Sequence, residues 1–139
     1  EMEDEMEVDI AYAALFGPMF GIIATEELHS AGVDTLLRLA GGWFPENPVV
    51  LWHVAQTEVR RGNLPSALYL LLDMEKMAVS GKYDRRTPFH PGILGMALWT
   101  NLALVAHQMG RRDVALRNYQ RILEADPNNE MAKQNMARL

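Results

Sequence analysis

The chain has 139 residues, 49% of them hydrophobic and 22% charged, as expected for one globular domain or a piece of a larger protein. It contains no cysteine, which excludes disulfide bonds and cysteine-ligated zinc. The formal net charge is −5, but residues 1–9 carry six acids and no base, so the rest of the chain is nearly neutral. This balance argues against a nucleic-acid-binding surface.

Residues 1–9 form an acidic leader, which we expect to be solvated and disordered because its like charges repel. The apolar run 10–24 follows, but it is shorter than the roughly 20 residues of a membrane span and contains Gly17 and Pro18. We expect a buried or partner-covered helix pair there and no membrane segment. The acidic start lacks the basic residues of a secretory signal, so we expect a cytoplasmic protein.

Residues 10–46 read as an atypical helical hairpin. Asp34 is placed to cap a short helix over 35–40, which we expect to end at Gly41 and Gly42. The next hairpin, 48–81, is clearer. Asn47 and Pro48 predict a helix start, Gly62 a turn, and Pro65 the start of a second helix that runs to about residue 79.

The insertion 82–95 is rich in glycine and proline and predicts a loop, with helix resuming near Pro91 or Gly92. It carries Tyr83, Arg85 and Arg86 close together. One interpretation is a contact site for an acidic segment, of which residues 1–9 are an example. The other is a solvated loop whose aromatic rings anchor it to the core.

Residues 96–129 contain two runs with the apolar spacing of amphipathic helices, joined by a turn at Gly110. Pro127 stops the second run, and 130–139 predicts a terminal capping helix. The stretch 96–129 resembles the tetratricopeptide repeat, a helix–turn–helix unit of about 34 residues. The characteristic positions that match are Trp99, Leu102, Ala103, Gly110, Ala115, Tyr119 and Pro127.

Residues 48–81 resemble a second, degenerate repeat through Leu51, Val54, Ala55, Gly62, Ala67 and Leu71. Glu58 and Met74 depart from it, since the family usually has an aromatic and a small residue at these positions. The resemblance implies an all-α fold over 10–139, with antiparallel helix hairpins stacked as a tetratricopeptide-like right-handed superhelix. It also implies a protein–protein interaction module or scaffold that binds a peptide or helix of a partner protein in its concave groove.

The resemblance also assigns the residues that face the groove. They are Val49, Trp52, Gln56, Val59 and Arg60 from the first of these hairpins and Thr100, Leu104, His107 and Gln108 from the second. Trp52 is the candidate anchor, with packing against the N-terminal hairpin as the alternative role. The lysine and asparagine with which some family members bind a terminal carboxylate are absent here.

No pattern in the chain indicates catalysis, a cofactor or a metal. The four histidines lack the spacing of a zinc motif, and neither a phosphate-binding loop nor a nucleophile motif occurs. We therefore expect a non-enzymatic protein. Two other functions stay open: a small secretion-type chaperone that forms a homodimer through its N-terminal helices, and the docking domain of a longer enzyme.

Overall fold

The computed structural model describes residues 31–85 and 87–139, and these described residues divide into two compact units between Pro45 and Glu46. The described residues contain six α-helices, one short 3-10 helix and no β-strand, which confirms the all-α class for this part of the chain. None of these helices has the length and hydropathy that a membrane crossing requires. The expectations for 1–9, for 10–24 and for Arg86 fall outside the described residues.

In the first unit, the described helix is α2, Ala31–Trp43. It is longer than the expected helix over 35–40, because it starts earlier and continues through Gly41 and Gly42. Neither glycine has the positive φ of a helix-ending residue, and an added Cβ would meet nothing within 4 Å at either position. Glycine inside a helix costs only about 1 kcal/mol relative to alanine, so a glycine pair does not by itself end a helix.

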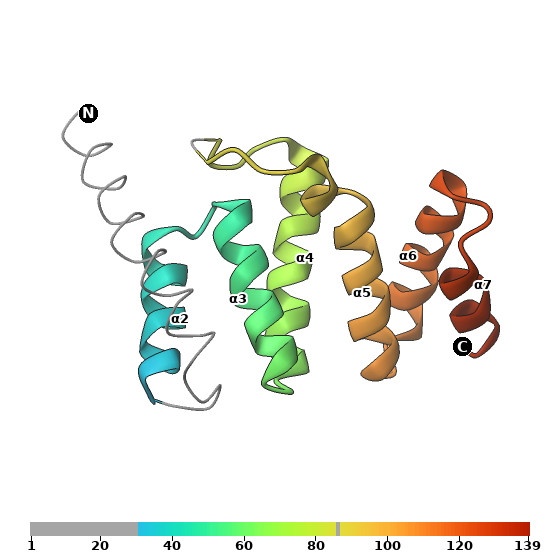
Figure 1. Cartoon of the computed structure of the whole chain (residues 1–139), viewed down its shortest axis with the longest axis horizontal. Helices are drawn as coiled ribbons and strands as arrows, with labels where there is room; N and C mark the ends of the chain where they lie inside the picture. Colours follow the sequence, from blue (N-terminus) through green and yellow to red (C-terminus); the bar gives the residue numbers. More distant parts are fainter. Residues whose placement is uncertain (1–30, 86) are drawn as a thin grey trace. The chain divides into compact units, whose positions relative to one another are not determined.

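The second unit contains five α-helices that run alternately up and down in chain order (Figure 1). They are α3 (Pro48–Arg60), α4 (Leu64–Ser80), α5 (Met96–Gln108), α6 (Arg112–Ala125) and α7 (Glu130–Ala137), with the 3-10 helix η1 (Pro91–Leu94) before α5. Helices α3 and α4 pack as one hairpin, α5 and α6 as a second, α4 packs on α5, and α7 packs on α6. Asn129 caps α7 by accepting the backbone N–H of Ala132 at 3.0 Å.

The two hairpins turn in the same way at Gly62 and Gly110, whose φ angles are 76° and 74°. This left-handed conformation is open to glycine and strained for other residues. Corresponding backbone hydrogen bonds close both turns. They run from the N–H of Arg61 to Thr57, Gly62 to Val59 and Asn63 to Glu58, and from Met109 to Val105, Gly110 to His107 and Arg111 to Ala106.

The core of this unit lies between the paired helices. Four alanines are fully buried where the helices of each hairpin approach: Ala55 and Ala67 in the first, Ala103 and Ala115 in the second. A larger side chain at these points would push the helices apart. The other buried apolar side chains of this core are Leu51, Leu68, Leu71, Met74, Met77, Leu98, Leu102, Val105, Ala106, Val114, Tyr119, Ile122 and Ala132.

The insertion folds back on the start of α3. The Asn47 side chain accepts the N–H groups of Val49 and Val50 and so caps the helix, while its Nδ2 donates to Thr87 Oγ1 at 3.0 Å. The N–H of Asp84 also donates to the Glu46 carbonyl at 2.8 Å. The loop therefore supplies part of the structure that starts the first hairpin.

A shared carboxylate joins the second helices of the two hairpins. Glu75 of α4 accepts from Arg117 at 2.9 Å and from Arg121 at 2.6 Å, both on α6. The Glu75 side chain is only 16% exposed, so this contact is better protected from solvent than an ordinary surface ion pair. It joins α4 to α6, the second helices of the two hairpins, on the side of the unit that these helices form.

Candidate functional site

The candidate site is the face formed by the first helix of each hairpin, α3 and α5. A side-chain hydrogen bond joins them directly, since Gln56 Nε2 donates to Asn101 Oδ1 at 2.9 Å. Asn101 in turn donates its Nδ2 to the Ala97 carbonyl of its own helix at 2.8 Å, which holds the amide in place. We call this surface the α3–α5 face, meaning the predicted groove residues together with Asn101.

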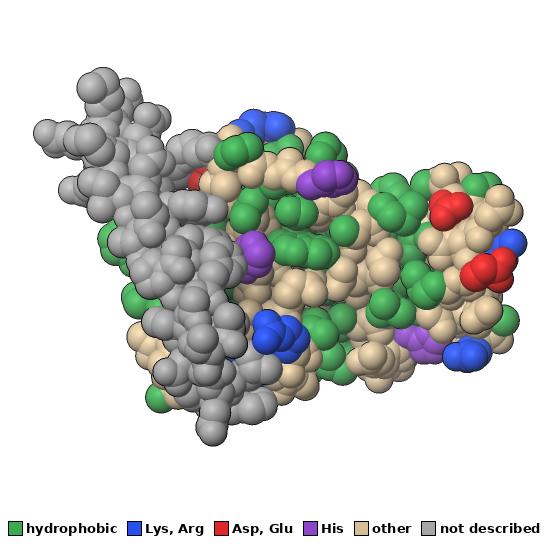
Figure 2. All heavy atoms as spheres, in the orientation of Figure 1, with side chains coloured by type: hydrophobic (Ala, Val, Ile, Leu, Met, Phe, Trp, Pro, Cys, Tyr) green, Lys and Arg blue, Asp and Glu red, His purple; other side chains and the backbone are tan. Residues whose placement is uncertain are grey.

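The structure places the predicted groove residues on two helices. Those of α3 are Val49, Trp52, Gln56, Val59 and Arg60, and those of α5 are Thr100, Leu104, His107 and Gln108. Arg60 and Gln108 are exposed and the other seven are half-buried. Figure 2 shows hydrophobic side chains gathered on the part of the surface where α3 and α5 lie, with few charged ones among them. The face therefore offers apolar contact together with amide groups.

Two of these residues also support the core. Trp52 and Val59 pack against the buried cluster of the second unit while keeping part of their surface open. An indole that packs against the core on one side and is exposed to solvent on the other has the features of a binding anchor. Little side-chain entropy remains to be lost when such a ring contacts a partner. The alternative role for Trp52, packing against the N-terminal hairpin, concerns contacts between the two units and stays a prediction.

His107 and Thr100 use their polar atoms inside the protein. Thr100 Oγ1 donates to the Met96 carbonyl at 2.8 Å, which satisfies the hydroxyl within α5. His107 Nδ1 lies 2.9 Å from the Tyr119 hydroxyl, and the two rings meet edge to face with centroids 5.9 Å apart. His107 therefore links α5 to α6 through Tyr119, a contact that the sequence pattern did not predict.

Asn101 is the residue of this face that the sequence analysis missed. A signal for it was available, because Asn101 lies three residues before the predicted Leu104 and so shares a face of α5 with it. Its pairing with Gln56 was not visible, since it depends on how close α3 and α5 come after packing.

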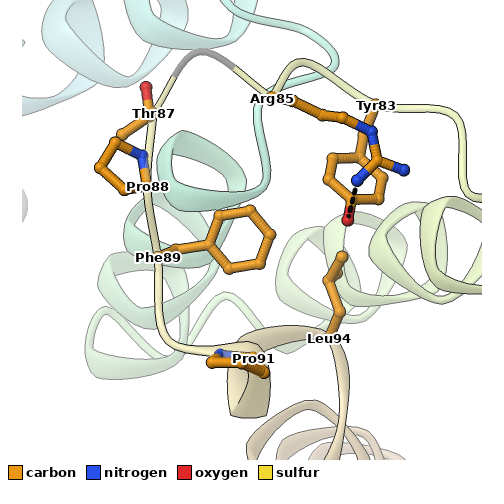
Figure 3. A pocket seen from close by; sticks show the side chains of 7 residues that line it. All are labelled: Tyr83, Arg85, Thr87, Pro88, Phe89, Pro91 and Leu94. Carbon is orange, nitrogen blue, oxygen red and sulfur yellow. Dashed lines mark hydrogen bonds between the residues drawn. The ribbon is translucent and has the colours of Figure 1, made fainter.

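The insertion forms a second concave feature, shown in Figure 3. A pocket of about 340 Å³ is lined by Tyr83, Arg85, Thr87, Pro88, Phe89, Pro91 and Leu94. The Arg85 guanidinium lies 4.1 Å from the Tyr83 ring centroid and donates to the Tyr83 hydroxyl at 2.9 Å and to the Gly81 carbonyl at 2.6 Å. Arg85 is thus held within the loop, while the Tyr83 ring packs against the core.

The ionisable side chains of the described residues form no group of three or more that suits a metal ion. On α3, burial lowers the pKa of His53 below its usual value, which favours the neutral ring. Near the start of α6, backbone hydrogen bonding from Val114 and the nearby Arg111 lower the pKa of the exposed Asp113. Neither residue belongs to the α3–α5 face as defined above.

Comparison with known proteins adds no relative. The sequence matches no family model and no curated protein, and the structure matches no solved one. The function has to be inferred from the residues and contacts of this chain.

Proposed function

We propose that this chain is a non-catalytic protein–protein interaction module whose α3–α5 face receives a peptide or helix of a partner protein. In this proposal the two hairpins are tetratricopeptide-like repeats, stacked with the handedness of a right-handed superhelix. Their first helices line the binding surface, and their second helices, joined through Glu75, form the supporting wall.

The repetition of the hairpins supports this proposal. The turns at Gly62 and Gly110 share one conformation and one hydrogen-bond pattern, and the buried alanines recur at corresponding points. A solenoid needs units of this kind, because each hairpin buries its apolar side only against the next. The lengthened connection between the hairpins does not disturb this, since α4 still packs directly on α5.

The single observation that carries the function is the Gln56–Asn101 hydrogen bond. It fixes α3 beside α5, so half-buried apolar side chains from both helices contribute to one surface. Gln56 donates one N–H to Asn101. A glutamine amide has a second N–H and a carbonyl oxygen besides. Such a combination of apolar anchors and amides suits a peptide or helix better than it suits a small metabolite.

The test is affinity capture with the 139-residue chain and three variants, read by quantitative mass spectrometry. Trp52→Ala removes the proposed anchor and Leu104→Glu places a charge on the α5 side of the face. Tyr69→Ala is the matched control, because Tyr69 is a 68% exposed aromatic residue on α4, outside the face. We expect partners to be lost by at least about tenfold with the first two variants, the size typical of a binding hot spot, and kept with the third.

Each variant is first compared with wild type by far-UV circular dichroism and thermal unfolding, so that loss of binding is not confused with loss of fold. If Trp52→Ala, Leu104→Glu and wild type recover the same proteins equally, the α3–α5 face is not the binding surface. If Tyr69→Ala loses the same partners, the surface lies on the second helices instead.

A further inference from the structure

A pocket of about 370 Å³ lies between α4 and α6, beside the carboxylate that joins these two helices. We call it the α4–α6 pocket. All of its lining residues are described, belong to the second unit and lie outside the α3–α5 face. They are Glu75, Lys76, Val79 and Ser80 on α4 and Arg117 and Arg121 on α6.

The lining of the pocket carries more positive than negative charge. Three cationic side chains stand against the single carboxylate of Glu75, which leaves a formal charge of +2. Asp73 does not line the pocket and lies 4.0 Å from Lys76, an exposed ion pair that contributes little. The negative end of α4 also opposes an anion here, but its charge of about half an elementary unit is smaller than this excess.

Glu75 holds two guanidinium groups in place without using all of their donors. Arg117 Nη2 donates to both carboxylate oxygens, at 2.9 and 3.2 Å. Arg121 Nη1 donates to Glu75 Oε2 at 2.6 Å and to Asn118 Oδ1 at 3.3 Å. These contacts occupy one nitrogen of each guanidinium, and a guanidinium has five N–H groups on three nitrogens. Among the described residues, the ion pairs of both arginines are those with Glu75.

An apolar side chain lies next to these donors. Val79 lines the same pocket and is 79% exposed, which is unusual for a large hydrophobic residue of this chain. The volume is near the lower end of the roughly 300–1,000 Å³ that ligand pockets occupy. The pocket therefore has room for an anionic group together with part of the molecule that carries it.

We propose that the α4–α6 pocket binds a phosphate monoester, with Arg117 and Arg121 as donors to the phosphate oxygens and Val79 in contact with the esterified group. A phosphate monoester carries about −1.5 to −2 charges at neutral pH, which matches the lining better than the single charge of a carboxylate does. Guanidinium N–H groups also match the spacing of phosphate oxygens. The site does not depend on the function proposed for the α3–α5 face.

The test is an NMR titration of the 139-residue chain at neutral pH and constant ionic strength, with methyl phosphate in one series and sodium propionate in another. The arginine Nε–H signals and the backbone amides of α4 and α6 report binding. We expect saturable shifts with methyl phosphate and an affinity for propionate at least about tenfold lower, because propionate carries less charge. No saturation with methyl phosphate, or equal affinities for the two probes, would overturn the proposal.

Variants of the two arginines locate the binding site. Arg117→Gln and Arg121→Gln should each weaken the binding of methyl phosphate about tenfold, the loss expected for a charge-assisted hydrogen bond. Arg112→Gln is the matched control, since it removes the same charge from an exposed residue of α6 that does not line the pocket. It should stay within about twofold of wild type. An equal loss in all three variants, with their folds confirmed by thermal unfolding, would contradict a site in the pocket.

A phosphate monoester can be part of a phosphorylated protein or of a small metabolite, and a peptide probe distinguishes these two sources. The probe is a capped tripeptide with phosphoserine between two valines. An affinity at least about tenfold above that of methyl phosphate, lost in Val79→Ser, identifies a phosphorylated protein as the ligand. An affinity equal to that of methyl phosphate identifies a small phosphate ester. A gain that survives Val79→Ser, or equal binding of the unphosphorylated peptide, would contradict the proposed geometry.

Discussion

The hairpins α3–α4 and α5–α6 have turns of the same conformation, but different side chains stabilise them. In the first, Glu58 is 5% exposed and accepts from Arg61 Nη1 at 2.9 Å and from Asn63 Nδ2 at 2.5 Å. At the corresponding point of the second hairpin stands Ala106, which is fully buried. There the end of α5 is bound instead through His107 to the buried Tyr119.

This comparison shows how the buried carboxylate of Glu58 is tolerated in the first turn. Two donors from the adjoining turn satisfy it. One backbone turn can therefore be supported by a polar network or by an aromatic ring. The two hairpins of this chain have the same residues at the glycine and buried alanine positions, while the side chains that support the turns differ.

The largest expected loss of stability is at Tyr119. We compare it with Leu71, which occupies the corresponding place in the first hairpin. Both are fully buried. Tyr119→Ala should lower the free energy of unfolding by about 4 kcal/mol and Leu71→Ala by about 3 kcal/mol, because both leave a cavity and Tyr119→Ala also removes the hydrogen bond to His107. Urea denaturation followed by circular dichroism measures both. A loss for Tyr119→Ala no larger than that of the exposed control Tyr69→Ala would contradict the role of Tyr119.

The next effect concerns Glu58, the difference between the two turns. Glu58→Ala should cost about 2–3 kcal/mol, since it leaves the Arg61 guanidinium and the Asn63 amide without the buried carboxylate that they share. Glu58→Gln keeps the shape and one acceptor and should cost about 1 kcal/mol. Both losses are measured by chemical denaturation. Equal losses would mean that the neutral acceptor kept by Glu58→Gln contributes nothing, and no loss in Glu58→Gln would mean that the charge of Glu58 does not matter to the turn.

A smaller effect tests what the hairpins share. Gly62→Ala and Gly110→Ala should each cost about 1 kcal/mol, the strain of a left-handed non-glycine residue, because a new Cβ meets no atom within 4 Å at either site. Thermal unfolding of the two variants should give the same change. A clearly larger loss at one site would mean that the turns are less alike than their hydrogen bonds indicate.

The smallest effect is a pH dependence specific to the first hairpin. Burial lowers the pKa of His53, whereas Asn101 occupies the corresponding position on α5 and does not titrate. The unfolded chain then binds more protons than the folded one, so this contribution to stability is complete above pH of about 6.5 and is lost as the pH falls towards the folded-state pKa. His53→Asn should flatten the stability curve over this range and leave it unchanged near pH 8. A curve as steep as that of wild type would assign the acid sensitivity to other groups.

The sequence predicted most of the second unit because its signals are local. The helices expected from Pro48 and from Pro65 are α3 and α4, and proline, glycine and apolar spacing mark their ends. The extension of α2 through Gly41 and Gly42 was missed, since the helix penalty of glycine is small. The Gln56–Asn101 bond, the Glu58 network and the His107–Tyr119 contact were also missed. Each of them joins side chains whose distance depends on packing and not on spacing along the chain.

The contact between Asn47 and Thr87 has a consequence for the order in which the chain is completed during synthesis. The cap of α3 forms early from Asn47 Oδ1, but the amide of the same side chain has to wait for Thr87, forty residues later. Thr87 follows α3 and α4 in the chain and precedes α5. Synthesis therefore supplies every residue of the first hairpin, and of its contact with the insertion, before the first residue of α5.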